Sequence, residues 1–301
     1  MNRTFLFASI LLAIVCCKEQ SNDVEIVYWG SEFPNDSAII FSPEHISIKE
    51  SREGNGVFSN DGSRFFFTQT DFFNNVSIQQ MDLSGTIWSS PVKASFSDTG
   101  DNWEAAPSPN GEYVVFLSNR SNQVRPLGKP WMSLLDSNGL WQAPRPILLP
   151  IPESEGIGHP YIDMDHIMYY SAFLPGGRGN IDIYFSDLSA DSLATINLGA
   201  PVNSESDELQ PSLAADKSFL LFTSNRPGGY GKYDIYISFL NDSIWSEPKN
   251  LGPKINTEHD EFSAWATPDG RFVLFDRVIG REQDIYWISA DILDEVSDND
   301  Q

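Results

Sequence analysis

Acidic side chains recur in this sequence at one relative position, a few residues before each of five apolar segments. The candidate binding residues, together with two histidines beside them, are Glu53, Asp101, Glu104, Glu155, His159, Asp207, Glu208, His259, Asp260 and Glu261. If these side chains converge on one opening, their charges focus a negative field there. Such an opening would bind a cation or the basic end of a peptide, and Ca²⁺ is the one cofactor that the pattern suggests.

Carboxylates around one opening could also serve as acid, base or nucleophile in glycoside hydrolysis. The candidate acids for that chemistry are Glu53, Asp101, Glu104, Asp207 and Asp260. A dedicated catalytic site should break a repeat, whereas acids recur here in every unit, which argues against catalysis. Repeated Asp and Glu side chains also commonly accept hydrogen bonds from turn amides. We therefore predict no catalytic residue, and both a functional and a structural role for the acids stay open.

Composition and motifs argue against several other functions. The net charge is −23, with 42 acidic and 19 basic residues, so nucleic acid is an unfavourable partner for this surface. The four histidines lack metal-ligand spacing, and the chain has no Gly-x-Ser-x-Gly motif. Cysteine occurs only at positions 16 and 17, which predicts a fold held by packing rather than by disulfides.

An internal repeat indicates which elements position the acids. Five segments align: "VFSNDGSRFFFTQT", "APSPNGEYVVFLSN", "PYIDMDHIMYYSA", "PSLAADKSFLLFTSN" and "AWATPDGRFVLFDR". Their turn residues, Asp61, Asn110, Asp165, Asp216 and Asp269, lie 49 to 55 positions apart. This spacing is near the length of one β-propeller blade and too long for a leucine-rich or ankyrin unit.

Each unit repeats the same strand signals. A short strand ends in Asp-Gly or a substitute, which is typical of a tight hairpin, and an unbroken apolar run follows that must be covered on both faces. A strand such as "DIYIS" and a short Trp-x-x-Pro edge strand complete the unit. The glycine-rich stretch "SNRPGGYGKYDIYIS" joins two such strands and lacks the Gly-x4-Gly-Lys-Ser/Thr pattern of a phosphate-binding loop. The predicted structural loop residues are Arg226, Asp182, Asp234 and Asp284.

Four further segments carry a resemblance to a known family. "SNRPGGYGKYDIY", "WSEPKNLG", "INTEHDEFSAWATPDG" and "VNSESDELQPSLAAD" resemble the TolB-type, WD-repeat-like β-propeller repeats of bacterial envelope lipoproteins. The resemblance covers roughly residues 40 to 290 and is most specific in the last two units. It implies a propeller in a cell-envelope setting, and it implies no common reaction.

The count of outer strands indicates how the ring closes. The fifth unit lacks its own outer strand, and the segment from Ala38 to Phe41 can supply it. We therefore predict an all-β fold, a five-bladed propeller over residues 38–292 closed by an N-terminal velcro strand. Six blades are the alternative if residues 24 to 40 form more than an edge. Residues 293–301 are predicted to be a disordered acidic tail.

The N-terminus reads as a lipoprotein signal peptide over residues 1–17. An apolar run from Phe5 to Val15 follows Arg3, and it is too short to span a bilayer. A cysteine at the end of such a run resembles a lipobox, with Cys17 as the lipidated residue and Cys16 as the alternative. Residues 18–37 would then be a linker to the propeller.

The sequence thus favours a non-catalytic, lipid-anchored propeller that acts as a binding or assembly module in a bacterial cell envelope. We expect it on the outer membrane, facing the periplasm or the cell surface, with a protein, peptide or glycan as partner and with membrane contact through the lipid anchor only. The alternative is a carbohydrate-active, glycosidase-like enzyme that uses carboxylates at the propeller axis.

Overall fold

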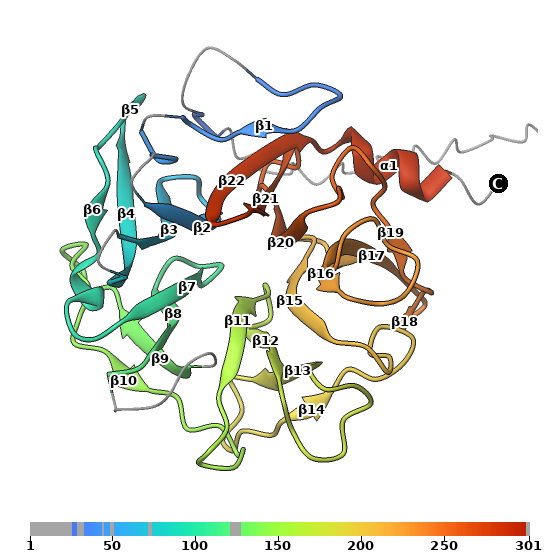
Figure 1. Cartoon of the computed structure of the whole chain (residues 1–301). Coiled ribbons are helices and arrows are strands. Elements are labelled where there is room, and N and C mark those ends of the chain that lie inside the picture. Colours follow the sequence, from blue (N-terminus) through green and yellow to red (C-terminus); the bar gives the residue numbers. More distant parts are fainter. Residues whose placement is uncertain are drawn as a thin grey trace, which may run out of the picture.

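Five small antiparallel sheets stand around a central axis in the computed structural model, which describes residues 26–28, 33–43, 45–48, 51–71, 74–120 and 128–298 (Figure 1). Each sheet is one blade, and its first strand lies nearest the axis. The prediction of a five-bladed β-propeller is confirmed. Among the described residues, no helix combines the length and apolar character needed to cross a bilayer.

In each blade the first three strands follow one another outward from the axis, and the remaining short strands pair with the third. Blade 1 consists of β2 (Arg52–Phe58), β3 (Arg64–Thr70), β4 (Val76–Ser84), β5 (Ile87–Trp88) and β6 (Val92–Lys93). Blade 2 consists of β7 (Asn102–Pro107), β8 (Tyr113–Ser118), β9 (Lys129–Leu134) and β10 (Arg145–Pro146), with a short 3-10 helix at Ser95–Ser97 before it. Blade 3 consists of β11 (Ile157–Ile162), β12 (Ile167–Ala172), β13 (Asp182–Asp187) and β14 (Ile196–Asn197). Blade 4 consists of β15 (Glu208–Leu213), β16 (Phe219–Ser224), β17 (Asp234–Asn241), β18 (Ile244–Trp245) and β19 (Lys249–Asn250). Blade 5 consists of β20 (Asp260–Ala266), β21 (Phe272–Ile279), β22 (Glu282–Ser289) and β1 (Ile39–Ile40).

The second strand of each blade is the most deeply buried, as its unbroken apolar sequence predicts. All six residues of β8 are buried, as are five of the six in β16. A neighbouring blade covers each face of these strands, so polar alternation would place polar side chains in the core. Apolar side chains from adjacent blades therefore interlock, and the core is a set of layers between blades.

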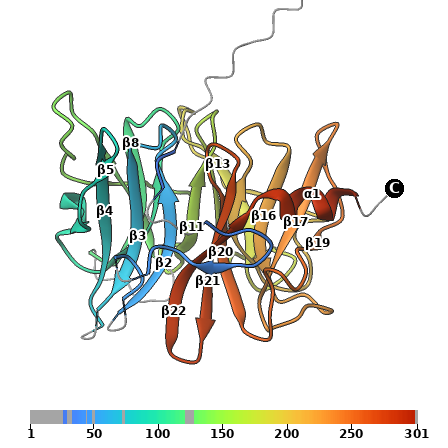
Figure 2. The same ribbon diagram turned by 90° about the horizontal axis from the view of Figure 1, so that it is seen from above.

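The ring has two faces, which the strand directions define (Figure 2). The hairpins between first and second strands lie on one face, called here the turn face. Each hairpin has a left-handed residue at the same place: Gly62, Gly111, His166, Lys217 and Gly270. Connections between second and third strands, such as the β21–β22 turn, lie on the opposite face, called here the loop face.

The first and last units share one sheet. Strand β1 pairs antiparallel with β22, with Ile39 opposite Trp287, and the Phe41 N–H donates to the Ile285 carbonyl. The predicted velcro closure is therefore confirmed. Ile26, which lies in the segment predicted as a linker, is 3% exposed and packs in the apolar layer between blades 5 and 1.

Helix α1 (Asp291–Asp298) occupies the beginning of the predicted disordered tail. Its Ile292 and Leu293 side chains are buried in the apolar layer between blades 4 and 5. The helix therefore differs from the expected disorder, because these two apolar residues dock an otherwise acidic segment. Cys16 and Cys17 lie outside the described residues, and the signal peptide stays a prediction.

Candidate functional site on the propeller axis

Five residues in equivalent positions form a ring around the axis, one from the middle of each inner strand. They are Asn55, Glu104, His159, Gln210 and Ser263, and each has a left-handed φ between 45° and 58°. At each one the pairing register between first and second strands shifts, which marks a β-bulge. We call these residues the bulge ring.

Hydrogen bonds from one blade to the next hold the bulge ring. The His159 N–H donates to Glu104 Oε2 at 2.6 Å, and the Ser263 N–H donates to Gln210 Oε1 at 2.9 Å. In blades 1 and 2 the acceptors come from the second strand of the preceding blade. The Asn55 N–H donates to both Asp276 oxygens at 2.9 Å, and the Glu104 N–H donates to Thr68 Oγ1 at 2.9 Å. A bulge frees these amides from their own sheet, so they bind a neighbouring blade instead.

The bulge ring lies between two recesses on the axis. The recess on the loop face, called here the polar cavity, has an open volume of about 990 Å³. It is lined by Arg52, Gly54, Asn55, Thr68, Thr70, Val76, Trp103, Glu104, His159, Gln210, Phe262, Asp276, Val278 and Gln283. The recess on the turn face, called here the apolar recess, has an open volume of about 770 Å³, and proline, alanine and aromatic side chains dominate its wall.

One imidazole nitrogen in the polar cavity has two polar neighbours. His159 Nε2 lies 2.9 Å from Glu104 Oε1 and 2.7 Å from Gln210 Nε2. Because Gln210 Oε1 accepts the Ser263 N–H, its amide nitrogen faces the ring. The unprotonated nitrogen can accept from Gln210, and the protonated one can donate to Glu104. Which of the two contacts is a hydrogen bond therefore depends on the tautomer of the imidazole.

Asp276 is the most perturbed acid of the polar cavity. It extends from β21, is 2% exposed, and accepts from the Asn55 N–H and from Gln283 Nε2. Burial removes the carboxylate from water and raises its pKa from 3.8 to about 7, although these hydrogen bonds act in the opposite direction. The nearby charge of Glu104 raises it further. A Cβ on Gly54 would collide with the side-chain ends of Gln283 and Asp276, so a larger residue there would displace them.

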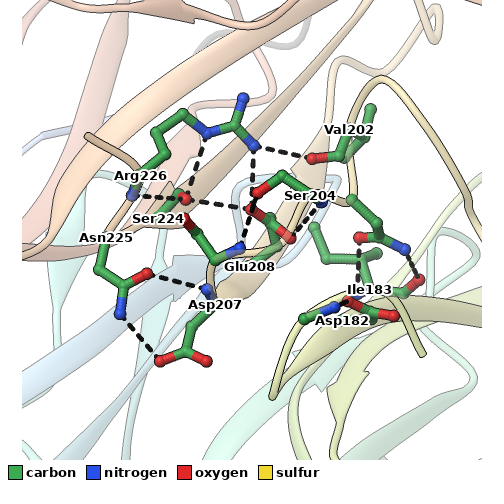
Figure 3. A network of polar contacts seen from close by, with 12 residues as sticks. Asp182, Ile183, Val202, Ser204, Asp207, Glu208, Ser224, Asn225 and Arg226 are labelled. Atoms are coloured by element: carbon green, nitrogen blue, oxygen red, sulfur yellow. Dashed lines mark hydrogen bonds and ion pairs between the residues drawn. The ribbon is translucent and has the colours of Figure 1, made fainter. Parts of the chain in front are cut away.

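Three of the predicted binding acids instead belong to the scaffold. Glu53, Glu208 and Glu261 are 0% exposed, two residues before the bulge ring in their blades. Glu208 Oε1 accepts from Arg226 at 3.1 Å and from two serine hydroxyls (Figure 3). Burial raises the pKa of Glu208 in spite of the arginine. Glu261 accepts from Arg277 Nε at 2.8 Å, whereas Glu53 accepts from serine, amide and backbone donors.

Three further predicted acids secure loops on the loop face. Asp101 accepts from the side-chain amide of Asn119 at 2.8 Å, and Asp207 accepts from that of Asn225 at 2.9 Å. Figure 3 shows the second pair. Asp260 accepts from the Tyr233 N–H at 3.2 Å. None of the three lines either recess in the part of the chain that the structure describes. Their contacts are those of turn amides and loop side chains.

The remaining predicted residues divide between the axis and the rim. Glu104 and His159 are the two predicted residues that line the polar cavity. Glu155 and His259 are half-buried and line neither recess among the described residues.

The loop residues named from the sequence lie where the glycine-rich connections turn. Asp234 accepts from the Tyr230 and Gly231 amides, and Asp182 accepts from the corresponding amides of its own loop. Arg226 donates to the Val202 carbonyl at 2.8 Å and to Glu208, not to the acid of its own loop. Asp284 is only half-buried and follows a two-residue turn, so it closes no such glycine-rich loop.

Sequence reasoning missed Gln210, Ser263 and Asp276. The available signal was a polar residue in the middle of each inner strand, where the sequences read "EGNGVF", "NWEAAP", "IGHPYI", "ELQPSL" and "DEFSAWA". Polar residues inside a buried strand are uncommon unless they have partners. Asp276, within "VLFDR", gave no such signal. Its place beside the axis follows from its hydrogen bonds to the bulged Asn55 of the next blade, which the sequence does not reveal.

The polar cavity combines two carboxylates with an imidazole, side-chain amides and hydroxyls. It can accept hydrogen bonds from a bound group and transfer a proton near neutral pH. Within the described ranges, no group of three or more histidine, cysteine, aspartate or glutamate side chains converges in the manner of a metal site. Ca²⁺ binding therefore stays a proposal without a defined ligand set.

Comparison with known proteins gives similarity in structure alone. No protein-family model and no curated protein matches the sequence. A protein assigned as TolB in Agrobacterium tumefaciens superposes with a TM-score of 0.50 and 19% identity, over 79% of this chain and 77% of that one. TolB from Acinetobacter baumannii gives a TM-score of 0.49 and 17% identity, over 80% of this chain and 52% of that one, about half of its length. The oligogalacturonate lyase of Vibrio parahaemolyticus gives a TM-score of 0.43 and 13% identity, over 85% and 76%. With its five blades and its repeat sequences, this chain has a TolB-type β-propeller fold.

Proposed function

We propose that this chain is a lipid-anchored binding or assembly module of a bacterial cell envelope, which holds a protein or peptide partner at the apolar recess. The TolB-type fold and the N-terminal apolar run that ends in Cys16 and Cys17 support the envelope setting. Lipidation at Cys17 would attach the module to its membrane.

The observation behind this proposal is the apolar wall of the recess. Inner strands contribute Val57, Ala106, Pro107, Pro160, Tyr161, Pro211, Ala264 and Trp265, and turns add Pro109, Met164, Ala215 and Pro268. Met164 is 51% exposed at the rim. A concave apolar surface with a few polar groups at its base is the usual form of a binding site. Prolines also lack an N–H, so the wall has few backbone donors and would contact a partner mainly through apolar packing.

The contacts of the predicted acids support a binding module over an enzyme that uses these acids, and none of the acids lines the apolar recess. Most of them are engaged with amides, hydroxyls and arginines of the scaffold, as the repeat in every unit suggested. The partner of the apolar recess would then be a protruding apolar segment of a protein. Methionine and aromatic side chains adapt to such segments and are enriched in recognition surfaces.

Crosslinking in native envelopes tests the proposal. We expect Met164→Glu to reduce capture of the partner at least tenfold, because it places a charge at the apolar rim. Leu148→Glu is the matched control, since Leu148 is 81% exposed and lines neither recess. Equal capture by both variants would contradict binding at the apolar recess.

A second candidate function is carbohydrate-active catalysis, favoured by one observation. Glu104 and Asp276 line the same polar cavity, and each departs from the residue type of its counterparts in the other blades. Asp276, with a pKa of about 7, would be suited to general acid catalysis. Release of reducing sugar from envelope glycans, lost in both Glu104→Gln and Asp276→Asn, is the expected result. Unchanged release in either variant would exclude this pair.

A further inference from the structure

Asp276 is a carboxylate buried in the wall of the polar cavity. Among the described residues, no lysine or arginine forms an ion pair with it, and its donors are an amide N–H and a side-chain amide. The comparably buried Glu208 and Glu261 each pair with an arginine of their own blade, whereas Glu53, which has no such arginine among the described residues, lines neither recess. A buried carboxylate without a counter-charge is costly when it is ionised, so a bound cation would stabilise its charged form.

The walls of the polar cavity suit an organic cation. Glu104 provides a second carboxylate, and Thr68 and Thr70 provide hydroxyl acceptors. Trp103 and Phe262 add aromatic surface, which attracts cations and covers the carbon atoms next to the charge. The cavity is open to solvent and wide enough for a group larger than a metal ion.

We infer that the polar cavity binds a primary ammonium or guanidinium group, such as that of a basic peptide side chain, between Asp276 and Glu104. An ammonium group has three donors and no acceptor, which matches two carboxylates and neighbouring hydroxyls. This site lies on the loop face, so it does not depend on the partner proposed for the apolar recess. Failure of either proposal leaves the other standing.

The inference makes binding dependent on pH. Asp276 attracts a cation only when it has lost its proton, and with a pKa of about 7 it loses that proton between pH 6 and pH 8. The other charged or titratable groups lining the cavity are Glu104, His159 and Arg52. Arg52 is a positive group on the same wall and opposes cation binding, so variants must isolate the contribution of Asp276.

Isothermal titration of the mature chain with butylammonium tests the site, with 1-butanol as the uncharged probe of the same shape. We expect butylammonium to bind about tenfold more tightly at pH 8 than at pH 6, and to release a proton near pH 7. Asp276→Asn should remove the proton release and weaken binding at pH 8 by about tenfold or more. Glu104→Gln should weaken binding and keep the proton release.

The control is Glu155→Gln, which removes an acid that lines neither recess and should leave affinity unchanged. A melting curve of each variant verifies folding, and Glu104→Gln keeps the test decisive if Asp276→Asn does not fold. A blocked pentapeptide with a central lysine distinguishes a peptide ligand from a free amine. Tighter binding of the pentapeptide than of butylammonium indicates a peptide ligand, and weaker binding indicates a free amine. Equal binding of 1-butanol, no binding at pH 8, or proton release that persists in Asp276→Asn would overturn the inference.

Discussion

At the scale of single residues, the bulge ring separates structural repetition from chemical variation. All five positions share one backbone conformation, yet they carry five different side chains. A left-handed φ costs a non-glycine residue about 1 kcal/mol, and at four of the five positions a hydrogen bond from the freed amide to a neighbouring blade offsets that cost. Two ring side chains, those of Glu104 and Gln210, also accept such bonds, so side chains at this position serve both the scaffold and the polar cavity.

The pH dependence of stability should report the burial of Asp276. Its pKa is about 7 in the folded chain and 3.8 in the unfolded chain, so its contribution to stability is full below pH 4 and is lost as the pH rises to 7. Asp276→Asn carries no charge at any pH. Its free energy of unfolding relative to wild type should therefore increase from pH 4 to pH 8, by up to about 4 kcal/mol. Urea unfolding at several pH values measures this difference, and a constant difference would contradict it.

The candidate site was only partly predictable from the sequence. Glu104 and His159 were found because they precede their apolar segments, as all the recurring acids do. The sequence could not distinguish them from Glu208 or Glu261. These acids lie two residues earlier on their inner strands, where the side chain is buried in the scaffold and does not face the axis. That distinction depends on where the β-bulge falls, which is a property of strand pairing.

At the scale of elements, a recurring arginine lock joins three of the blades to the connections that enter them. Arg226 donates to the carbonyl of Val202 in the preceding connection and to a buried acid on the inner strand. Arg120 forms the same pair of bonds in blade 2, with Asn102 in place of the acid. In blade 5, Arg277 reaches the Ile255 carbonyl and a glutamate. The lock therefore fixes the entry of the chain into three of the five blades.

Removing the lock of blade 4 should expose the cost of its buried acid. Arg226→Ala leaves the 0%-exposed Glu208 without its counter-charge, and we expect a loss of about 3–5 kcal/mol in the free energy of unfolding. Adding Glu208→Gln should recover part of that loss, because it removes the unpaired charge. Arg145→Ala, at an exposed position of β10, is the control and should change stability by less than about 0.5 kcal/mol. Additive effects of the two blade 4 substitutions would argue against the lock.

The elements themselves were more predictable than their ends. Strand order and hairpin positions follow from the apolar runs and from turn residues such as Asp61 and Asp269, which are local signals. Helix α1 was missed because an acidic sequence gives little helical signal alone, and only docking of Ile292 and Leu293 onto the ring fixes it. Burial of Ile26 in the predicted linker has the same origin, since both depend on tertiary contacts.

At the scale of the whole molecule, closure of the ring depends on a small seam. Strand β1 contributes only two paired residues to blade 5, so backbone bonds alone are a weak closure. Aromatic packing strengthens it: Phe41 lies 5.1 Å from Trp287 and 5.3 Å from Phe65, measured between ring centroids. The seam thus joins the N-terminal segment, the last blade and the first blade in one apolar layer.

Truncation of Phe41 tests whether this seam stabilises the entire ring. Phe41 is 0% exposed, so Phe41→Ala should cost about 3–5 kcal/mol through lost burial and an unfilled cavity. Phe33 contacts the same Trp287 ring but is 49% exposed, and Phe33→Ala should cost less than about 1 kcal/mol. Blades are buried only against their neighbours, so opening the seam should also free blade 3 on the far side. Amide hydrogen exchange should therefore accelerate in β12 as much as in β21 of the Phe41→Ala protein. Acceleration confined to blades 5 and 1 would show that the stability of a distant blade does not depend on the seam.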